Sequence, residues 1–388
     1  MEVRVNKKVL ENSIKEAYKL YSKRASAPFL NSVWIKAEQN KGVFIQFTDS
    51  KIEYSCSIRG AIKESGLVGI ECKQLVDLLK SLPDNMVKIY KDNEQAVIQQ
   101  ENRKFNLETY DNTWSMGYTP LPDNPIISLP KGKLLEIIEK TENSIKKDDG
   151  VDDPMDHMNI HVTENKVRFC AINGFQFSMV EIENKQLQEL IKEVVPANSI
   201  SIHGKRIQKL KKLIKKTDCQ LTIDDDKVYF IKNENGPFTE QNLKHSTILS
   251  VPYYTTQWVD YQKFFTYFEN KLSELKIDKD NLLESLKIMK GFINEYNECF
   301  VFYPKKNQLT IKFQNQVEEN IPARYEGELE KISFPIPTMI DNLKRIHSKQ
   351  VLFKFTGENR PCMIQGTEEN EHTLITMPVD MEEDKFSN

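Results

Sequence analysis

Apolar residues recur along this chain in one pattern that is used three times. Each copy has a stretch in which every second residue is apolar, then about ten residues with apolar positions three and four apart, then a second alternating stretch. The copies read VGIECKQLVDLLKSLPDNMVKIY, SISIHGKRIQKLKKLIKKTDCQLTI and KISFPIPTMIDNLKRIHSKQVLFKF. Equivalent apolar residues stand 132 residues apart, as Ile70, Ile202 and Phe334 do. The pattern therefore predicts three copies of a strand, a helix and a strand.

A second amphipathic helix is expected upstream of each copy, with alternating strands between the two helices. Its apolar residues are Val9, Leu10, Ile14, Ala17 and Tyr18 in the first copy, Leu134, Leu135, Ile137 and Ile138 in the second, and Leu282, Leu283, Leu286 and Met289 in the third. Short strands linked by turns pair antiparallel. We expect an α+β protein of three tandem domains, each with two helices packed on antiparallel sheets, at residues 1–120, 126–247 and 256–388.

The upstream helices are spaced less evenly, by 125 residues from Leu10 to Leu135 and by 148 residues from Leu135 to Leu283. An insertion before the third copy, which includes the aromatic run DYQKFFTYF, explains most of this difference. The expected linkers are residues 111–127 and 244–275. The repeat pattern also fits a tandem array of an unrelated module, because a repeated fold does not by itself identify a function.

The second helix of the middle copy carries seven basic residues and no acidic residue between positions 205 and 216. Lys205, Lys209, Lys212 and Lys216 follow steps of four, three and four, which places them on one helical face. Such a face can be simply solvated, but like charges without a compensating acid favour a polyanionic partner. Arg24 adds a basic residue at the end of the first helix. Because the net charge is −3, any contact with DNA must come from a local basic surface.

The sequence lacks several features that other functions require. It contains no helix-turn-helix, zinc-finger or RNP-like pattern, so we expect binding to double-stranded DNA without sequence preference. Its six cysteines form no CxxC pair and no cluster with histidine, so we expect reduced thiols, no metal and no cofactor. The N-terminus is charged from its second residue and no apolar stretch approaches the roughly 18 residues of a membrane span. We expect a soluble, cytoplasmic protein that does not enter a membrane.

Three groups of residues carry a resemblance to a known family. In the first copy, KRASAPFLNSVWI and FTDSKIEYSCSI are similar to the family's Arg, Pro-x-Leu and Thr-Asp pattern. In the middle copy, CAINGFQFS stands where the family has Thr-Asp-Gly-His-Arg-Leu. In the third, YEGELEKISFPIPTMIDNLKRI, VLFKFTGENRPCMI and HTLITMPVDM are similar to the family's ending, which closes on Met-Pro-Met-Arg-Leu. Over nearly the whole chain the sequence resembles the bacterial sliding clamp, the β subunit of DNA polymerase III.

The resemblance implies a processivity factor without catalytic chemistry. It implies a head-to-tail homodimer in which six similar units close a ring around DNA, with the helices lining the hole. The implied partners are the replicative DNA polymerase, an ATP-driven clamp loader and other proteins with clamp-binding motifs. Dimer contacts are then expected at Phe105, Leu107, Phe292 and Ile293. Lys146 and Lys147 stand in for aromatic residues that the family has in a middle-copy loop facing DNA.

The resemblance also implies a cleft between the middle and last domains in which partners dock a short hydrophobic peptide. Carried over by motif, its lining is Ile172, Gly174, Phe175, Gln176, Phe177, Val259, Phe264, Ile375, Met377, Pro378, Val379 and Met381. Three positions depart from the family pattern: Gln176 and Asp380 replace arginines, and Phe175 replaces histidine. The departures predict a peptide preference that differs from that of other clamps.

Two other functions remain open on the sequence alone. Carboxylates and histidines that could serve metal-dependent phosphoryl chemistry are Asp152, Asp153, Asp156, His157, His161 and the run 224–226. However, no HExxH, P-loop, nucleophile elbow or GxGxxG-type loop accompanies them, and both acidic clusters fall in turn-like segments. The second alternative is an interaction scaffold of the same fold that does not encircle DNA.

Overall fold

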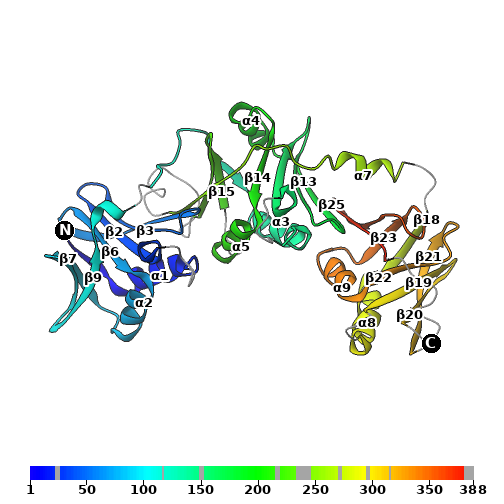
Figure 1. The fold of residues 1–388 in the computed structure, drawn as a ribbon, viewed down its shortest axis with the longest axis horizontal. Coiled ribbons are helices and arrows are strands. Elements are labelled where there is room, and N and C mark those ends of the chain that lie inside the picture. The colour runs from blue at the N-terminus through cyan, green and yellow to red at the C-terminus, as the bar shows by residue number, and fades with distance from the viewer. Residues whose placement is uncertain are drawn as a thin grey trace. The chain divides into compact units, whose positions relative to one another are not determined.

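The computed structural model describes residues 1–21, 27–115, 118–147, 153–214, 219–232, 246–269, 273–293, 298–313 and 316–379. The chain divides into two compact units. Its helices and strands are labelled in Figure 1. Unit 1 contains Met1–Glu136, Glu189–Ala197 and Lys205–Tyr254, and unit 2 contains Ile137–Gln188, Asn198–Gly204 and Thr255–Asn388. Among the described residues, no helix combines the length and the apolar character that crossing a membrane requires.

One order of elements occurs three times along the chain, as the sequence pattern predicts. The first repeat contains β1 (Glu2–Asn6), α1 (Lys7–Tyr18), β2 (Ser32–Glu38), β3 (Gly42–Thr48), β4 (Glu53–Ile58), β5 (Gly60–Glu64), β6 (Gly66–Glu71), α2 (Cys72–Ser81), β7 (Met86–Asp92), β8 (Gln95–Gln100) and β9 (Arg103–Tyr110). The middle repeat contains β10 (Ile127–Leu129), α3 (Lys133–Thr141), β11 (His157–Val162), β12 (Val167–Ile172), β13 (Gln176–Ile182), α4 (Lys185–Val194), β14 (Ser199–His203), α5 (Gly204–Leu213), β15 (Cys219–Ile223), β16 (Lys227–Lys232) and β17 (Thr247–Pro252).

The last repeat contains β18 (Ser273–Asp278), α8 (Lys279–Met289), β19 (Cys299–Lys305), β20 (Gln308–Phe313), β21 (Val317–Glu326), β22 (Ile332–Pro335), α9 (Ile336–Lys344), β23 (Gln350–Phe355), β24 (Cys362–Gly366) and β25 (Glu369–Thr376). Among the described helices, α4 and the short α7 (Gln262–Thr266) that precedes the last repeat have no counterpart in the other repeats. The α+β class is confirmed. The domain limits at residues 120, 126, 247 and 256 stay a prediction.

The first helices of the first and last repeats, α1 and α8, begin where the sequence supplies a side-chain cap. The side chain of Asn6 accepts a hydrogen bond from the backbone N–H of Val9 (3.2 Å) at the start of α1. Asp278 accepts from the backbone N–H groups of Asp280 (3.0 Å) and Asn281 (3.1 Å) at the start of α8. These side chains satisfy N–H groups that have no partner inside the helix. Both helices therefore start directly after the first strand of their repeat.

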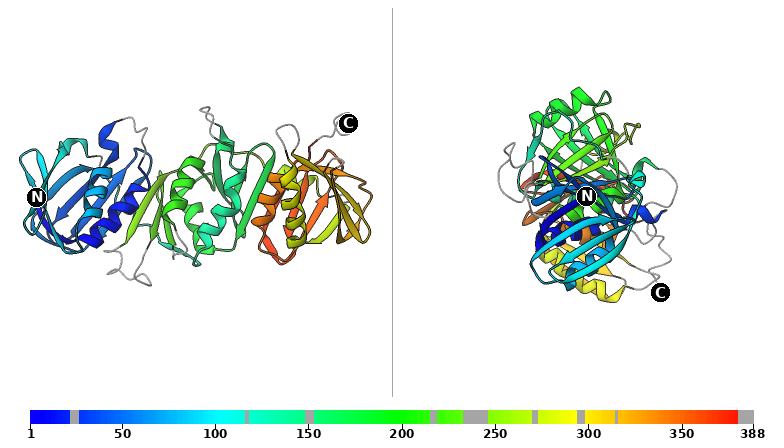
Figure 2. Two further views of the ribbon diagram at one scale, coloured as in Figure 1. Left: turned by 90° about the horizontal axis from the view of Figure 1, so that it is seen from below. Right: turned by 90° about the vertical axis from the view of Figure 1, so that its left-hand side faces the viewer.

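Helices cover the sheets in pairs (Figure 2). In unit 1, α1 packs beside α2, and in unit 2, α8 packs beside α9. In the core of the last repeat, four fully buried aromatic rings meet: Phe300, Phe302, Phe334 and Phe353. Phe300 and Phe302 are two residues apart on β19, so the two-residue period of a strand places both on the same face.

Each unit is built on one antiparallel sheet that runs across a boundary between repeats. The sheet of unit 1 has 13 strands in the order β10-β15-β16-β17-β4-β3-β2-β6-β9-β8-β7-β1-β5, and β17 joins β4 across the boundary. The sheet of unit 2 has 12 strands in the order β14-β11-β12-β13-β25-β24-β23-β18-β21-β20-β19-β22, and β13 joins β25 across the boundary. We call these strand pairs the first seam (β4 with β17) and the second seam (β13 with β25).

Ion pairs accompany the first seam, and in each of them the lysine comes from the middle repeat and the acid from the first. Lys232 contacts Glu16 at 2.8 Å and Lys227 contacts Glu53 at 2.7 Å. Lys209 of α5 also pairs with Asp49, whose other carboxylate oxygen accepts from the turn N–H groups that follow it. Opposite charge thus reinforces backbone pairing at this boundary.

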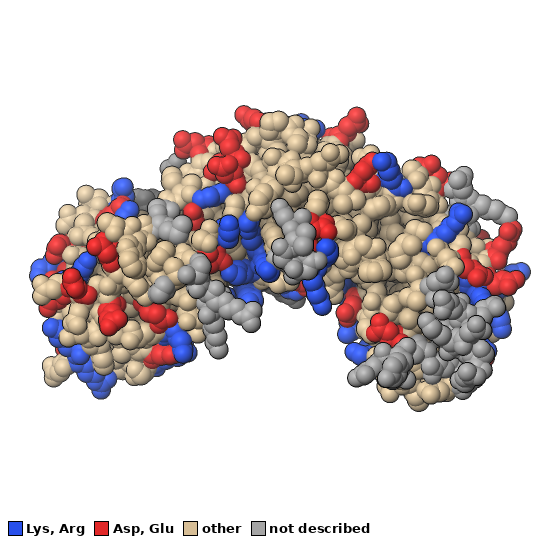
Figure 3. Space-filling view, viewed as in Figure 1, with Lys and Arg blue, Asp and Glu red and all other residues tan. Residues whose placement is uncertain are grey.

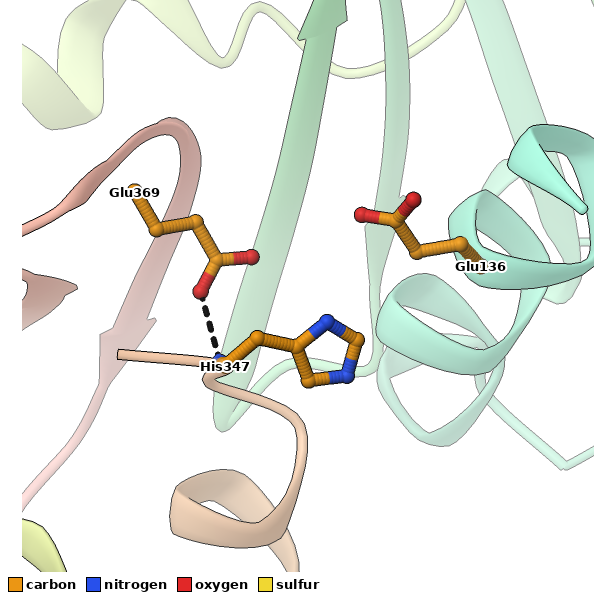
Figure 4. Close-up of side chains that lie close together, drawn as sticks. All are labelled: Glu136, His347 and Glu369. Carbon is orange, nitrogen blue, oxygen red and sulfur yellow. Dashed lines mark hydrogen bonds between the residues drawn. The ribbon is translucent and has the colours of Figure 1, made fainter. Parts of the chain in front are cut away.

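Buried polar groups accompany the second seam. Lys140, at the end of α3, forms an ion pair with Glu369 of β25, and both side chains are almost fully buried. The other oxygen of Glu369 accepts from the backbone N–H of His347 at 2.7 Å (Figure 4). The hydroxyl of Ser178 donates to the Lys140 carbonyl (2.8 Å) and lies 3.2 Å from Nε2 of His372. Buried charges require such partners, so this network fixes the middle and last repeats at one register.

Replacing Lys140 by Met should lower the free energy of unfolding by about 3–5 kcal/mol, because it leaves the Glu369 carboxylate buried without its counter-ion. Guanidinium chloride unfolding followed by circular dichroism measures this change. The double variant Lys140→Met/Glu369→Leu removes both charges and should recover most of the loss. A single variant as stable as the native chain would contradict a structural role for the pair.

Candidate nucleic-acid and partner interfaces

The basic helix predicted in the middle repeat is α5, and lysine and arginine side chains gather around it on the surface (Figure 3). Ile207, Leu210 and Leu213 are buried on one side of α5. Lys205 and Lys212 are exposed on another side. The helix therefore has the buried apolar stripe and the exposed basic face that its sequence predicts.

Two further basic residues of α5 serve contacts inside the protein. Lys209 is only 26% exposed and pairs with Asp49. Arg206 is buried, and its guanidinium donates to the Pro252 carbonyl (2.7 Å) and to the Tyr254 hydroxyl (2.8 Å). The exposed cationic face is consequently narrower than the sequence suggests, and Lys205 and Lys212 are its main described members.

The first helix contributes less positive charge than its lysines imply. Lys7 and Lys15 both contact Glu11, and their hydrogen bonds, with that of Lys15 the stronger cause, hold the pKa of the Glu11 carboxyl below its usual value. Lys19 lies 3.9 Å from Glu16. Arg24, predicted to bind DNA at the end of this helix, lies outside the described residues, as does Lys216 after α5.

Lys146 and Lys147, the two lysines predicted to face DNA from the middle-repeat loop, lie in different environments. Lys146 forms a 2.8 Å ion pair with Asp153, and this contact lowers the pKa of the Asp153 carboxyl. Lys147 is exposed. Of the two lysines, Lys147 therefore has the more accessible ammonium group for a phosphate.

The predicted cleft residues converge on one apolar group in unit 2, which we call the aromatic cluster. Its buried members are Cys170, Ile172, Phe177, Met179, Tyr261, Met363 and Ile375, against which pack Met155, Trp258, Val259, Phe264, Phe265 and Phe268. The cluster lies at the second seam, where Phe177 of β13 faces Ile375 of β25. Strands from two repeats and the segment that carries α7 thus build it together.

Three exposed apolar residues stand just before β13 or just after β25, the strands that carry Phe177 and Ile375 of the cluster. We call them the rim: Phe175, Met377 and Val379, with exposures of 75%, 38% and 37%. The backbone N–H of Met377 donates to the carbonyl of Phe175 at 2.8 Å, which holds the two residues beside each other. Gly174 adopts φ +90°, and a side chain there would meet no atom within 4 Å. Gln176 and Pro378 are half-buried. Large apolar side chains in contact with water mark a protein interaction site when they gather in one place.

Met381, the last residue predicted for the cleft, lies outside the described residues. The other predicted cleft residues differ in how deeply they are buried. Ile172, Phe177 and Ile375 belong to the buried cluster, Val259 and Phe264 pack against it, and the rim is exposed.

Tyr261 is a central member of the aromatic cluster that the motif comparison does not identify. Its ring stacks on Phe177 with centroids 5.5 Å apart, and its hydroxyl shares a 2.8 Å hydrogen bond with Nδ1 of His161. Arg168 donates to the same hydroxyl at 3.4 Å and pairs with Glu181 at 2.7 Å. Burial raises the pKa of Tyr261 to about 12, and burial together with Arg168 lowers the pKa of His161. The aromatic run DYQKFFTYF was the only sequence signal for this residue.

The residues predicted for dimer contacts lie in three settings. Phe105 is half-buried on β9 and Leu107, two residues further, is buried. Phe292 is 47% exposed in the 3-10 turn η5 (Lys290–Phe292) after α8. Ile293 packs against the core of the last repeat. Of the four, Phe292 therefore offers the most accessible apolar surface.

Strands β9 and β21 each leave part of one edge without a neighbouring strand in the described part of the chain. Residues 103–108 of β9 pair with β8 on one side, whereas β6 reaches only Thr109 and Tyr110 on the other. Residues 317–322 of β21 pair with β20, whereas β18 reaches only residues 323–326. Unpaired N–H and C=O groups along such an edge are a template for another strand.

The carboxylates considered for metal chemistry serve local structure instead. Asp153 caps the 3-10 turn η4 (Pro154–Asp156) through the N–H of Met155 at 2.9 Å and pairs with Lys146. Asp224 accepts from the N–H of Lys227 (2.7 Å) and from the hydroxyl of Tyr229 (2.6 Å). Asp152 lies outside the described residues. These contacts are those of turn residues, which the sequence favours for both acidic clusters.

Comparison with known proteins agrees with this architecture. The sequence matches the family description "DNA polymerase III beta subunit, N-terminal domain" over residues 1–113 and "DNA polymerase III beta subunit, C-terminal domain" over residues 269–380, which together are more than half of the chain. The beta sliding clamp of Haemophilus influenzae is 21% identical over 389 residues, covering 98% of this chain and 100% of the relative. That of Staphylococcus epidermidis is 22% identical over 397 residues, covering 98% and 99%.

Solved structures share the fold. The DNA polymerase sliding clamp from Bacillus subtilis superposes with a TM-score of 0.85 at 19% identity, covering 98% of this chain and 99% of its own. The clamp from Caulobacter crescentus superposes with a TM-score of 0.84 at 17% identity, covering 98% and 100%. The matches extend over all three repeats, and the chain belongs to the DNA polymerase III beta subunit family, the beta sliding clamps.

Proposed function

We propose that two copies of this clamp close head to tail into a ring around duplex DNA, and that the aromatic cluster and its rim tether the polymerase. As a member of its family the chain is a DNA sliding clamp, a non-catalytic accessory subunit that makes the polymerase processive. The observation that carries the ring is the unpaired edges of β9 and β21, which correspond to the two seams already formed within the chain. The protein works in the cytoplasm, where replication takes place.

The register of the missing seam follows from the repeats. Starting from the equivalent residues Ile70, Ile202 and Phe334, the cross-strand partners can be followed through each sheet. On the fourth strand in the order common to all repeats, the equivalent residues are Tyr54, Ser178 and Val317. For the last strand of each repeat the starting residues are Ile89, Leu221 and Phe353, which also stand 132 residues apart. Their partners lead to Phe105, Leu249 and Leu374.

The two seams inside the chain obey the same register. Tyr54 faces Leu249 in the first seam, and Ser178 faces Leu374 in the second. By the same rule, Val317 of one copy faces Phe105 of the other in the third seam. A head-to-tail contact of this kind uses two different surfaces, and it forms a closed ring only where the rotation between copies permits.

Charge supports this register. With Val317 opposite Phe105, the antiparallel ladder places Glu318 opposite Lys104 and Glu319 opposite Arg103. Lys104 and Glu318 are about half exposed in the single chain and can reach across a seam. Opposite charges at directly facing positions stabilise a strand pair, and a slip by one residue would separate them.

DNA contact is assigned to the helix surface around α5. Lys205 and Lys212 are exposed there, and Lys147 is exposed on the loop after α3. Phosphate contacts by lysine carry no sequence information, which suits a protein that slides. Because the ring itself retains the DNA, a few such contacts suffice, in keeping with a net charge of −3.

Partner docking is assigned to the aromatic cluster and its rim. An extended or helical peptide with apolar anchors can place them beside Met377 and Val379, which are exposed next to a buried apolar floor. Phe175 in place of the family's histidine and Gln176 in place of its arginine make this surface more apolar and remove a charge. We therefore expect partners whose peptide relies on aromatic or aliphatic anchors rather than on an acidic residue. A clamp-fold scaffold that does not encircle DNA remains the alternative.

Reversing the charge of Glu318 and Glu319 to lysine should convert the dimer to monomers, because two facing pairs become repulsive. Sedimentation equilibrium measures the subunit mass. The matched control is the chain that also carries Arg103→Glu and Lys104→Glu, whose net charge equals that of the native protein and whose dimer should return. A dimer that persists in the first variant, or does not return in the second, would place the contact elsewhere.

Substituting Lys205 and Lys212 by Glu should reduce the amount of clamp loaded onto nicked circular DNA roughly tenfold at 0.15 M salt and flatten its salt dependence. Retention after gel filtration measures loading. The control Lys41→Glu/Lys63→Glu makes the same charge change at exposed sites away from the helices. Equal loading by both variants and the native chain would remove α5 from the DNA surface.

Replacing Met377 and Pro378 by Ala should reduce polymerase stimulation on primed single-stranded circles by tenfold or more, the usual order for losing anchors of a docking site. The dimer mass should stay unchanged. Met86→Ala, which truncates a methionine 49% exposed on β7, is the matched control and should stimulate normally. Full stimulation by the double variant would contradict the docking assignment.

A further inference from the structure

The aromatic cluster is already occupied in part by a segment of the chain itself. The residues that lengthen the chain before the last repeat fold into α7 and its flanks, and Phe264, Phe265 and Phe268 from this segment pack on the cluster. The ring of Phe264 meets that of Phe177 edge to face with centroids 5.5 Å apart, and Phe265 does the same at 6.3 Å. Two adjacent aromatic side chains therefore cover the residue at the centre of the second seam.

The segment is held firmly at one end. Tyr261, directly before α7, is buried, stacks on Phe177 and hydrogen-bonds His161. Trp258 donates from Nε1 to the Pro154 carbonyl at 2.7 Å, and its ring lies 6.2 Å from that of Tyr261. These contacts fix the beginning of the segment on the middle repeat.

Beyond Tyr261 the described contacts are weak. The helix has five residues, far fewer than a helix needs to be stable alone, and no side chain caps its first turn. Phe264 and Phe265 are only half-buried, and Gln262, Lys263 and Thr266 are exposed. Segments with few buried contacts open locally at small cost while the rest of the protein stays folded. The part that covers Phe177 can thus move away while Tyr261 stays in place.

We propose that the segment from Tyr261 to Phe268 is a built-in competitor for partner peptides: α7 covers the aromatic cluster until a peptide with apolar anchors displaces Phe264 and Phe265. The inference rests on the docking role proposed above. Its basis is that the chain places on Phe177 the kind of side chain that a docking peptide would bring. When a partner binds only the open form, its observed affinity equals its affinity for that form multiplied by the fraction of clamp that is open.

The test uses the chain's own segment as the probe. A fluorescently labelled synthetic peptide of residues 259–269, VDYQKFFTYFE, is titrated with the native protein and with the Phe264→Ser/Phe265→Ser variant, and binding is followed by anisotropy. Removing the internal aromatic pair should tighten binding of the added peptide about tenfold or more, because the site no longer has to open. Equal or weaker binding by the variant would overturn the proposal, as would equal binding of a peptide in which the phenylalanines of positions 264 and 265 are serine.

Tyr267→Ser is the matched control, because Tyr267 lies beside α7, is 53% exposed and is not part of the cluster. It should bind the peptide as the native chain does. A measurement on the native protein covers the case in which the double variant does not fold. Saturating peptide should speed hydrogen exchange at the amides of Phe264 and Phe268, which donate within the segment at 3.0 and 2.9 Å. Unchanged exchange, or no binding by the native chain, would overturn the proposal.

The experiment separates this inference from the docking assignment. Suppose that Met377→Ala/Pro378→Ala leaves polymerase stimulation intact while Phe264→Ser/Phe265→Ser binds the peptide more tightly than the native chain does. In that case α7 covers a site that the polymerase does not use. Suppose instead that Met377→Ala/Pro378→Ala loses stimulation while the native chain and Phe264→Ser/Phe265→Ser bind the peptide equally. In that case the docking assignment is supported, and α7 is a fixed part of the docking site that a peptide does not displace.

Discussion

Pairing of strand edges is the constraint on which this clamp depends. Each repeat has a fourth strand and a last strand with one edge to satisfy, and backbone N–H and C=O groups left bare are costly when buried and prone to unwanted pairing when exposed. Within the chain this requirement is met twice, by β4 with β17 and by β13 with β25. The repeats therefore join through continuous sheets, and the edges of β9 and β21 that remain are complementary in register and in charge. In the proposed ring these two edges pair with each other.

Several charged residues serve this construction rather than the proposed DNA contact. Lys209, Lys227 and Lys232 pair with acids across the first seam, and Lys140 pairs with Glu369 beside the second. A basic residue on a helix thus cannot be assigned to DNA from its position in the sequence alone, since its contacts decide. What remains exposed around α5 is a small cationic surface. Weak, non-specific contact of this kind lets a ring slide, since retention comes from its closed shape.

The sequence predicted the repeated fold well because its signals are periodic. The 132-residue step between equivalent residues and the two-residue and 3.6-residue periods together determine the strands and the paired helices, and the structure confirms the α+β class. The motif comparison also brought together Ile172, Phe177 and Ile375, which form one buried group. From the segment before the last repeat it named Val259 and Phe264 but not Trp258, Tyr261 or Phe265, whose contacts with the cluster follow from the tertiary structure. Nor could it foresee that Lys146 and Lys209 are ion-paired, because their partners Asp153 and Asp49 follow from tertiary contacts rather than from helical spacing.

The central claim is that a third seam, of the same kind as the two within the chain, closes two copies into a ring. Negative-stain electron microscopy of the purified protein, with its solution mass determined on the same sample, tests this most directly. The account predicts a two-subunit closed ring with a central hole wide enough for duplex DNA. A monomer, or copies joined into open filaments, would contradict it and would leave the chain with the fold of a clamp but without its means of holding DNA.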